Sequence, residues 1–134
     1  MGEWVALDLP ITTMTHHYVV TDTVPEFEAL ETELPVVRDD RLVSGYVRMQ
    51  QKSGLIGIYE KANPNHVWDD GTPWEVEHEL FEPDYERIMP WLTNAFERMP
   101  VLAELGIKRT VHGAITHPPD GNLLLGPAPG IRNF

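Results

Sequence analysis

Cysteine is absent from this sequence, and basic residues are few. Without a thiol among its 134 residues, the chain excludes disulfides, thiolate catalysis and cysteine-based zinc sites. Ten Lys and Arg stand against 21 Asp and Glu, so the formal net charge is −11 at pH 7. Because phosphate groups and anionic lipids both require clustered positive charge, we expect neither a nucleic-acid nor a membrane partner.

Long apolar runs are missing as well. No segment approaches the roughly 18 apolar residues that indicate a membrane-spanning helix. The first residues, Met1 to Ala6, lack the cationic and then apolar layout of a signal peptide. The length fits a single domain, and we expect a cytoplasmic protein.

Generic catalytic motifs are absent too. The chain contains neither GxGxxG nor HExxH, and Pro127 stands where a phosphate-binding loop spaced like Gly121 and Gly126 requires lysine. The serines are Ser44 and Ser53, and neither lies in a GxSxG nucleophile elbow. The histidine and carboxylate residues that lie near one another, Glu75 to Glu79 and His112 with His117, are more typical of a solvated surface than of metal ligands, so we expect no metal site.

Short strands are the main expectation from the residues that are present. Twelve Pro and ten Gly divide the chain into short segments, which favours strands and loops over a helical bundle. In the first strand, alternation places His16 and Tyr18 on one face and His17 on the other, so the adjacent histidines do not share an ion. Gly54 is expected to supply a positive φ in a hairpin connector at 50–54. The expected strands are 14–21, 34–38, 42–49, 55–59 and 107–115.

One helical region is expected, from Pro83 to Met99, because apolar residues recur there at steps of three and four. Pro83 suits the first helical turn. Pro90 removes a backbone donor from the interior, which predicts a kink or two short helices, the second opened by Pro90. An acidic polar stretch, broken by Pro25, precedes these elements. Together they predict an α+β fold with a mixed or antiparallel sheet and one kinked helical region.

Four segments occur in an order that resembles a known family. They are MTHHYVVTD, LPVVRD with SGYVRMQ, GLIGIYE, and PPDGNLLLGPAPGIRNF. Together they look like the substrate-binding part of the dimethylglycine and sarcosine dehydrogenases, within the D-amino-acid-oxidase-like group of FAD-dependent amine oxidoreductases. The resemblance covers nearly the whole chain.

The resemblance implies a fragment of a larger enzyme. Residues 1–134 would form a partial FAD-dependent oxidoreductase domain, with the dinucleotide-binding unit outside it. The parent enzyme would oxidise an N-methyl amino acid, dimethylglycine or sarcosine, by hydride transfer to FAD. Folate would bind through a missing C-terminal module, and in a eukaryote the compartment would be the mitochondrial matrix. The implied partners are the small N-methyl amino acid and the remaining parts of the parent enzyme.

The same resemblance implies two catalytic residues. His16 matches a family histidine near the substrate, and an imidazole titrating near neutrality suits removal of a proton from an amine. The alternative is a structural histidine on a sheet face. The family often has a Tyr-Tyr pair, the first at the active site, where this chain has Gly45 and Tyr46, so Tyr46, which matches the second tyrosine, is the catalytic candidate.

Four further residues are expected to bind ligands. Arg48 and Arg38 are candidates for the substrate carboxylate, because guanidinium groups bind carboxylates through paired hydrogen bonds. Asp120 and Gly121 match the family's loop near the flavin, where a glycine allows close backbone approach. Surface arginines and a plain β-turn are the alternatives.

A different class of function also remains open. The chain itself contains no dinucleotide fingerprint, which fits a stand-alone acidic ligand-binding module without redox activity. If the first hypothesis holds, the isolated chain is expected to be inactive and to associate through an exposed apolar surface.

Overall fold

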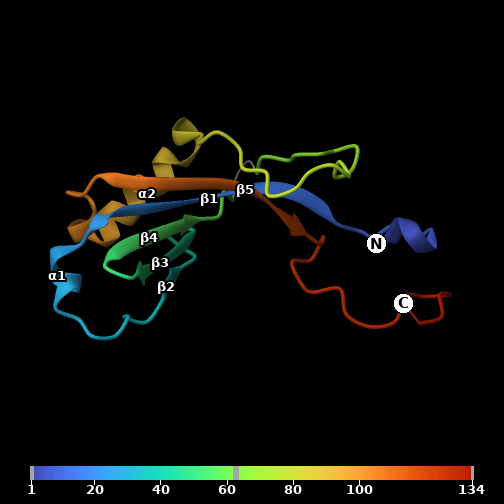
Figure 1. The fold of residues 1–134 in the computed structure, drawn as a ribbon, viewed down its shortest axis with the longest axis horizontal. Coiled ribbons are helices and arrows are strands. Elements are labelled where there is room, and N and C mark those ends of the chain that lie inside the picture. The colour runs from blue at the N-terminus through green and yellow to red at the C-terminus, as the bar shows by residue number, and fades with distance from the viewer. Residues whose placement is uncertain (1, 62–63, 134) are drawn as a thin grey trace.

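The computed structural model describes residues 2–61 and 64–133, and its centre is one five-stranded sheet. Every pair of neighbouring strands is antiparallel, in the order β2-β3-β4-β1-β5. Figure 1 shows the long strands β1 and β5 running side by side through the molecule. The predicted α+β class and the antiparallel option for the sheet are confirmed. The strands are β1 (Thr12–Thr23), β2 (Val37–Asp39), β3 (Gly45–Gln50), β4 (Ser53–Ile58) and β5 (Ile107–His117).

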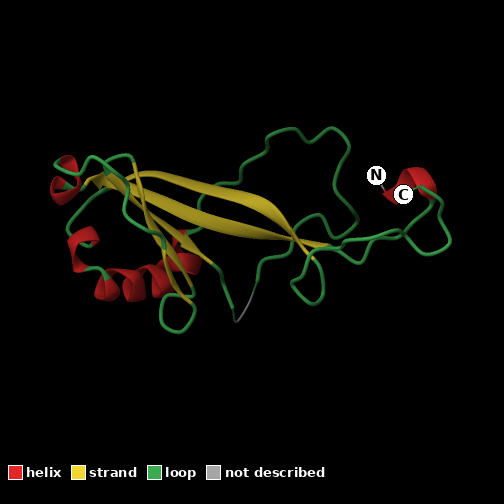
Figure 2. Ribbon diagram, turned by 90° about the horizontal axis from the view of Figure 1, so that it is seen from below, coloured by secondary structure: helices red, strands yellow, loops and turns green. Residues whose placement is uncertain are grey.

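The helices are short apart from one. They are the 3-10 turn η1 (Gly2–Val5), α1 (Pro25–Glu28), α2 (Tyr85–Arg98) and the 3-10 turn η2 (Pro100–Leu102). Figure 2 shows α2 lying along one side of the sheet. Among the described residues, no helix is long and apolar enough to cross a membrane.

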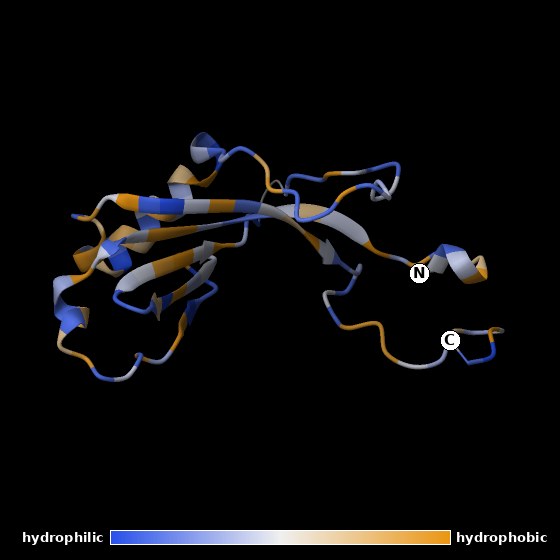
Figure 3. Cartoon of the chain, viewed as in Figure 1, coloured by the Kyte–Doolittle hydropathy of each residue, from blue (hydrophilic) through white to orange (hydrophobic). Residues whose placement is uncertain are grey.

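The core lies between α2 and one face of the sheet, which we call the helical face. Ile88, Leu92 and Ala95 of α2 are buried against a cluster that includes Val19 of β1 and Ile56 of β4. The colouring in Figure 3 shows apolar and polar residues interspersed along the strands. Successive side chains of a strand point to opposite sides of the sheet. That second side, which we call the aromatic face, carries His16, Tyr18, Tyr46 and Gly57.

The strand predictions were correct in number but shifted at their ends. The segment predicted at 34–38 is β2, which begins at Val37. The segment predicted at 42–49 is β3, which begins only at Gly45. The delay has a local cause, since the Asp39 carboxylate accepts hydrogen bonds from the backbone N–H groups of Arg41 and Leu42 and so holds a turn there.

Gly54 does not have the predicted role in the hairpin. Gln51 takes the positive φ of 57°, and Gly54 lies inside β4. A Cβ at position 54 would come within 2.7 Å of Leu102 Cδ2 and would displace that side chain, so this glycine serves close packing rather than turn geometry.

Two helix predictions are corrected. Pro90 lies inside a single helix, α2, so the alternative of two short helices is wrong. The helix begins at Tyr85 with Asp84 as its N-cap, so Pro83 precedes the first turn. Pro25 does not break its segment but opens α1, where a proline N–H is not needed.

Candidate functional site

Three aromatic side chains meet on the aromatic face. The ring centroids of His16 and Tyr59 are 4.6 Å apart with an interplanar angle of 27°. The Tyr46 ring lies 6.2 Å from His16 and 5.9 Å from Tyr59. His16 comes from β1, Tyr46 from β3, and Tyr59 follows the last residue of β4. We call His16, Tyr46 and Tyr59 the aromatic cluster.

The strand register explains the position of the Tyr46 ring. Gly57 of β4 pairs with Tyr46 on one side and with Tyr18 on the other, so all three lie in one row across the sheet. A Cβ on Gly57 would overlap Cζ, Cε1 and the phenol oxygen of Tyr46. The Tyr46 ring therefore occupies the space above Gly57. The sequence-based site did not include Gly57, although a glycine inside a predicted strand is a signal for close approach of another group.

His16 is held in its neutral form by its surroundings. Burial lowers the pKa of the His16 imidazole below its ordinary value, and His117 adds to the lowering, while a backbone hydrogen bond with Ile58 acts against it. A neutral imidazole has a free nitrogen lone pair. His16 can therefore accept a proton at neutral pH.

Tyr46 keeps its phenolic proton. Burial is the main cause that raises the pKa of Tyr46, and Tyr59 and Tyr18 contribute in the same direction, while Arg48 opposes them. The Tyr46 hydroxyl can therefore donate a hydrogen bond throughout the neutral range. The structure thus brings both predicted catalytic residues, His16 and Tyr46, into one cluster.

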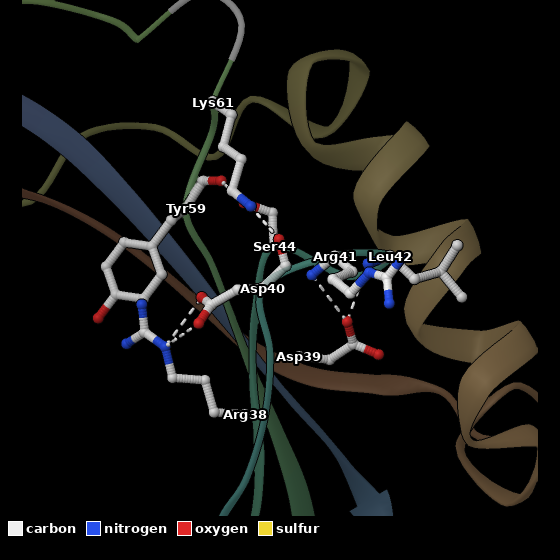
Figure 4. A network of polar contacts seen from close by, with 8 residues as sticks. All are labelled: Arg38, Asp39, Asp40, Arg41, Leu42, Ser44, Tyr59 and Lys61. Atoms are coloured by element: carbon white, nitrogen blue, oxygen red, sulfur yellow. Dashed lines mark hydrogen bonds and ion pairs between the residues drawn. The ribbon is translucent and has the colours of Figure 1, made fainter.

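Arg38 lies beside this cluster and is already paired. Its guanidinium carbon is 5.3 Å from the centroid of the Tyr59 ring, and its Nε donates to both oxygens of Asp40, at 2.9 and 3.1 Å. Figure 4 shows this pair, with the Lys61 amine donating to the backbone carbonyl of Asp40. Arg38 is 60% exposed, so its remaining N–H groups are open to a ligand.

Arg48 lies two residues along β3 from Tyr46 and therefore on the same face. Its Nη1 donates to the backbone carbonyl of Met49 at 3.0 Å, and its Nη2 is 3.5 Å from Oε1 of Gln50. Arg38 on β2 lies directly opposite Tyr46 on β3 in the strand register. Both predicted carboxylate ligands thus flank Tyr46.

Asp120 and Gly121 lie apart from the aromatic cluster. His16 pairs with Gly113, and β5 continues to His117 before the loop begins. Figure 1 shows the chain beyond β5 leading away from the sheet. Gly121 has the expected positive φ, 71°, and its N–H donates to the carbonyl of Pro118. The loop is a tight turn, and its predicted contact with a flavin stays a prediction.

A buried polar network occupies the opposite, helical face, and sequence reasoning missed it. Glu60 Oε1 lies 3.5 Å from Nδ1 of His17, and Glu60 Oε2 lies 2.6 Å from Nε of Arg87 on α2. The backbone N–H of Asp84 donates to His17 Nε2 at 3.2 Å. The proton of a neutral His17 therefore sits on Nδ1, facing Glu60.

His112 extends this network. Its ring stacks on His17 with centroids 3.6 Å apart, and its Nδ1–H donates to the Glu82 carbonyl at 2.7 Å. Burial, reinforced by His112, lowers the pKa of His17 to about 4, so two stacked cations do not form at neutral pH. Burial raises the pKa of Glu60, and Arg87 opposes that rise.

The described residues offer little to a phosphate or a metal ion. Within residues 2–61 and 64–133, no group of three or more His, Cys, Asp or Glu could hold a metal. The N-terminus of α2 is capped by the Asp84 carboxylate, which accepts from the Arg87 N–H at 3.1 Å, and Glu86 follows in the first turn. These negative charges oppose an anion there.

A cavity of about 640 Å³ lies between η1, the start of β1 and the loop at 68–74. Among the residues that the structure describes, its lining includes Glu3, Asp8, Asp69 and Asp70 and no Lys, Arg or His. An amino acid carboxylate or a phosphate does not fit these surroundings. The arginine-flanked aromatic cluster is the better site for an anionic small molecule.

Known proteins match the chain over its full length. No protein-family model matches it. It is 40% identical to human mitochondrial dimethylglycine dehydrogenase over 139 residues, spanning the whole chain and 16% of that protein. It is 34% identical to human mitochondrial sarcosine dehydrogenase, again over the whole chain and over 14% of that protein. The predicted resemblance to these two enzymes is confirmed.

The fold has a solved counterpart. The L-proline dehydrogenase from P. horikoshii matches 90% of this chain with a TM-score of 0.63 and 21% identity, and the match covers 28% of that protein. The shared fold is that of a segment within a larger dehydrogenase chain. This chain likewise spans about a sixth of its curated relatives.

Proposed function

We propose that this chain is the substrate-binding part of an FAD-dependent dehydrogenase that oxidises an N-methyl amino acid, dimethylglycine or sarcosine. The observation that carries the proposal is the 40% identity to dimethylglycine dehydrogenase along the entire chain. The neutral His16 within a cluster of aromatic rings supports it, because the proposed chemistry needs a base beside a bound amine.

His16 removes a proton from the bound substrate. An N-methyl amino acid is an ammonium ion at neutral pH, and its nitrogen lone pair must be free before a C–H bond can release hydride. The rings of Tyr46 and Tyr59 attract the cationic amine through their π faces. Arg38 and Arg48, which flank Tyr46, bind the substrate carboxylate through N–H donors.

FAD supplies the hydride acceptor when it is bound, and other polypeptide holds its dinucleotide. The capped, acidic N-terminus of α2 does not fit a pyrophosphate. The aromatic cluster and the turn at Asp120–Gly121 are the parts of this chain proposed to approach the flavin. A folate carrier for the released carbon and the remaining parts of the enzyme are further proposed partners.

We also propose a compartment. Both curated relatives carry the word mitochondrial in their names. A mitochondrial matrix location is proposed for a eukaryotic source and a cytoplasmic one for a prokaryotic source.

The test is the rate of flavin reduction in the full-length protein. Mixing it anaerobically with dimethylglycine or sarcosine should bleach the flavin, and His16→Gln should slow this step by about 10²–10⁴-fold, the usual contribution of a general base. His78→Gln, an exposed histidine, is the matched control and should react at the original rate. Equal rates for the two variants would remove His16 from the mechanism.

A stand-alone acidic binding module is the second candidate. It is favoured by the lack of a phosphate-binding turn in the described part of the chain. Calorimetry with dimethylglycine separates the two functions, because a binding module takes up the amine without any flavin. Amine binding by the full-length protein only when it carries FAD supports the dehydrogenase.

A further inference from the structure

Two residues that are neighbours on β1 face two residues that are neighbours after β4, with one contact on each side of the sheet. His16 and His17 are neighbours on β1, and Tyr59 and Glu60 are neighbours directly after β4. On the aromatic face the rings of His16 and Tyr59 stack at 4.6 Å, and on the helical face His17 Nδ1 lies 3.5 Å from Glu60 Oε1. Each pair therefore joins the candidate site to the buried network beneath it.

Tyr59 needs such an anchor because it lies beyond the paired part of its strand. The last residue of β4 is Ile58, which pairs with His17 and with Gly45. Ser44 holds the backbone of Tyr59, since the Tyr59 N–H donates to the Ser44 carbonyl at 2.8 Å and the Ser44 hydroxyl donates to the Tyr59 carbonyl at 2.6 Å. Both bonds run to Ser44 and act on the main chain of Tyr59, and neither one contacts its ring.

Glu60 supplies the second anchor. Its side chain is 7% exposed, and a carboxylate so well buried requires a cationic partner. Arg87, on α2, supplies that charge, with its Nε 2.6 Å from Oε2 of Glu60. The fully buried His17 lies beside the other carboxylate oxygen, with its Nδ1 3.5 Å from Oε1. With its side chain held on the helical face, Glu60 fixes the direction of the neighbouring Tyr59 side chain toward the aromatic face.

We propose that Glu60 is a positioning residue that, paired with Arg87 and packed beside His17 under the sheet, keeps the Tyr59 ring against His16 and thereby orients that imidazole. The effect on turnover rests on the proposed function, whereas the effect on the environment of His16 does not. Glu60, on the helical face, thus acts on the candidate site on the aromatic face.

The test is residue-by-residue labelling of histidines with diethyl pyrocarbonate in the full-length protein, read by peptide mass spectrometry. The reagent attacks accessible neutral imidazoles, and exposed His78 serves as the internal reference. In Glu60→Ala, His16 should react roughly threefold or more faster relative to His78, because a ring that covers it is released. Glu86→Ala, a neighbouring acid in the first turn of α2, is the matched control and should leave the ratio unchanged.

Unchanged His16 labelling in Glu60→Ala, with His17 and His112 still protected, overturns the proposal. If Glu60→Ala fails to fold, its histidines react alike, and Glu60→Gln then decides. That variant keeps the size of the side chain and loses the charge that binds Arg87. Faster labelling of His16 in Glu60→Gln supports the proposal, and labelling like the original protein contradicts it.

Turnover gives a second readout that a loss of stability alone does not produce. Greater exposure moves the pKa of His16 back up toward its ordinary value, so the acid limb of the pH profile for flavin reduction should shift to higher pH in the Glu60 variants. Absence of turnover in the unmodified protein would count against the proposed function alone. Turnover with unaltered His16 labelling in the Glu60 variants would count against the positioning role alone.

Discussion

Tyr46 and Gly57 face each other across β3 and β4, and the tyrosine ring fills the space that a side chain at position 57 would occupy. This relationship places the Tyr46 ring over Gly57, and its centroid is 6.2 Å from that of the His16 ring. A glycine at a central strand position weakens the strand, since it packs no side chain. Its presence here is explained by the ring that it accommodates.

Gly57→Ala is expected to displace the Tyr46 ring from the sheet. The added methyl group overlaps the ring and the phenol oxygen, so the free energy of unfolding should fall by about 1–3 kcal/mol, as overpacking does elsewhere. Urea denaturation measures the loss. In the Tyr46→Ala background, Gly57→Ala should cost much less than in the original protein, because the clash has then lost one partner. Additive losses in the two variants would contradict the direct overlap.

Stability is expected to fall on mild acidification because of His17. Its pKa is about 4 in the folded protein against 6.5 for an ordinary histidine, so the unfolded chain binds more protons between these values. The folded state should lose about 3 kcal/mol as the pH falls from 7 to 4, at 1.36 kcal/mol per pH unit. Glu60, whose pKa is raised, acts in the opposite direction and reduces this loss.

The measurement for His17 is urea denaturation at several pH values between 7 and 4. His17→Asn should flatten the dependence on pH, since an amide does not titrate. His78→Asn provides a control, because that side chain is exposed. An unchanged slope in His17→Asn would assign the acid sensitivity to other groups.

Pro90→Ala is expected to stabilise the protein. Pro90 is exposed within α2 and leaves the carbonyl of Glu86 without its helical donor. Alanine restores that donor, and the free energy of unfolding should rise by about 1–3 kcal/mol. Thermal unfolding followed by circular dichroism measures the change. A lower melting temperature would indicate that the helix requires the proline for its packing against the sheet.

Asp40→Asn is expected to strengthen carboxylate binding if Arg38 is a substrate ligand. The Asp40 carboxylate now takes the Nε donor of Arg38, and an asparagine releases part of that positive charge. The KM for dimethylglycine should fall by about threefold, equivalent to about 0.6 kcal/mol.

The KM for dimethylglycine measured in Arg38→Gln and in Arg48→Gln shows which arginine contacts the substrate. The arginine that contacts the substrate carboxylate should raise KM by at least about tenfold when replaced, since charge-assisted hydrogen bonds contribute about 1.5–3 kcal/mol. If only Arg48→Gln raises KM, Arg38 serves the loop between β2 and β3 and is not part of the substrate site.

Local patterns predicted much of this molecule. Alternation along β1 placed His16 and His17 on opposite faces, and the structure confirms this, since His16 stacks with Tyr59 and His17 with His112. Helical spacing predicted α2 to within two residues at its start. Strand ends were less accurate, because a side-chain bond from Asp39 decides where β3 begins.

The sequence by itself determined the α+β class, the two faces of the strands and the resemblance to the dimethylglycine and sarcosine dehydrogenases, because these depend on residue order and on short periodicities. Only the tertiary structure revealed that Tyr46 lies over Gly57, that Arg38 is held by Asp40, and that Glu60 meets Arg87 and His17 under the site. The physical reason is that these contacts join residues from different strands and a helix. Their partners are chosen by strand register and by burial, which no local pattern specifies.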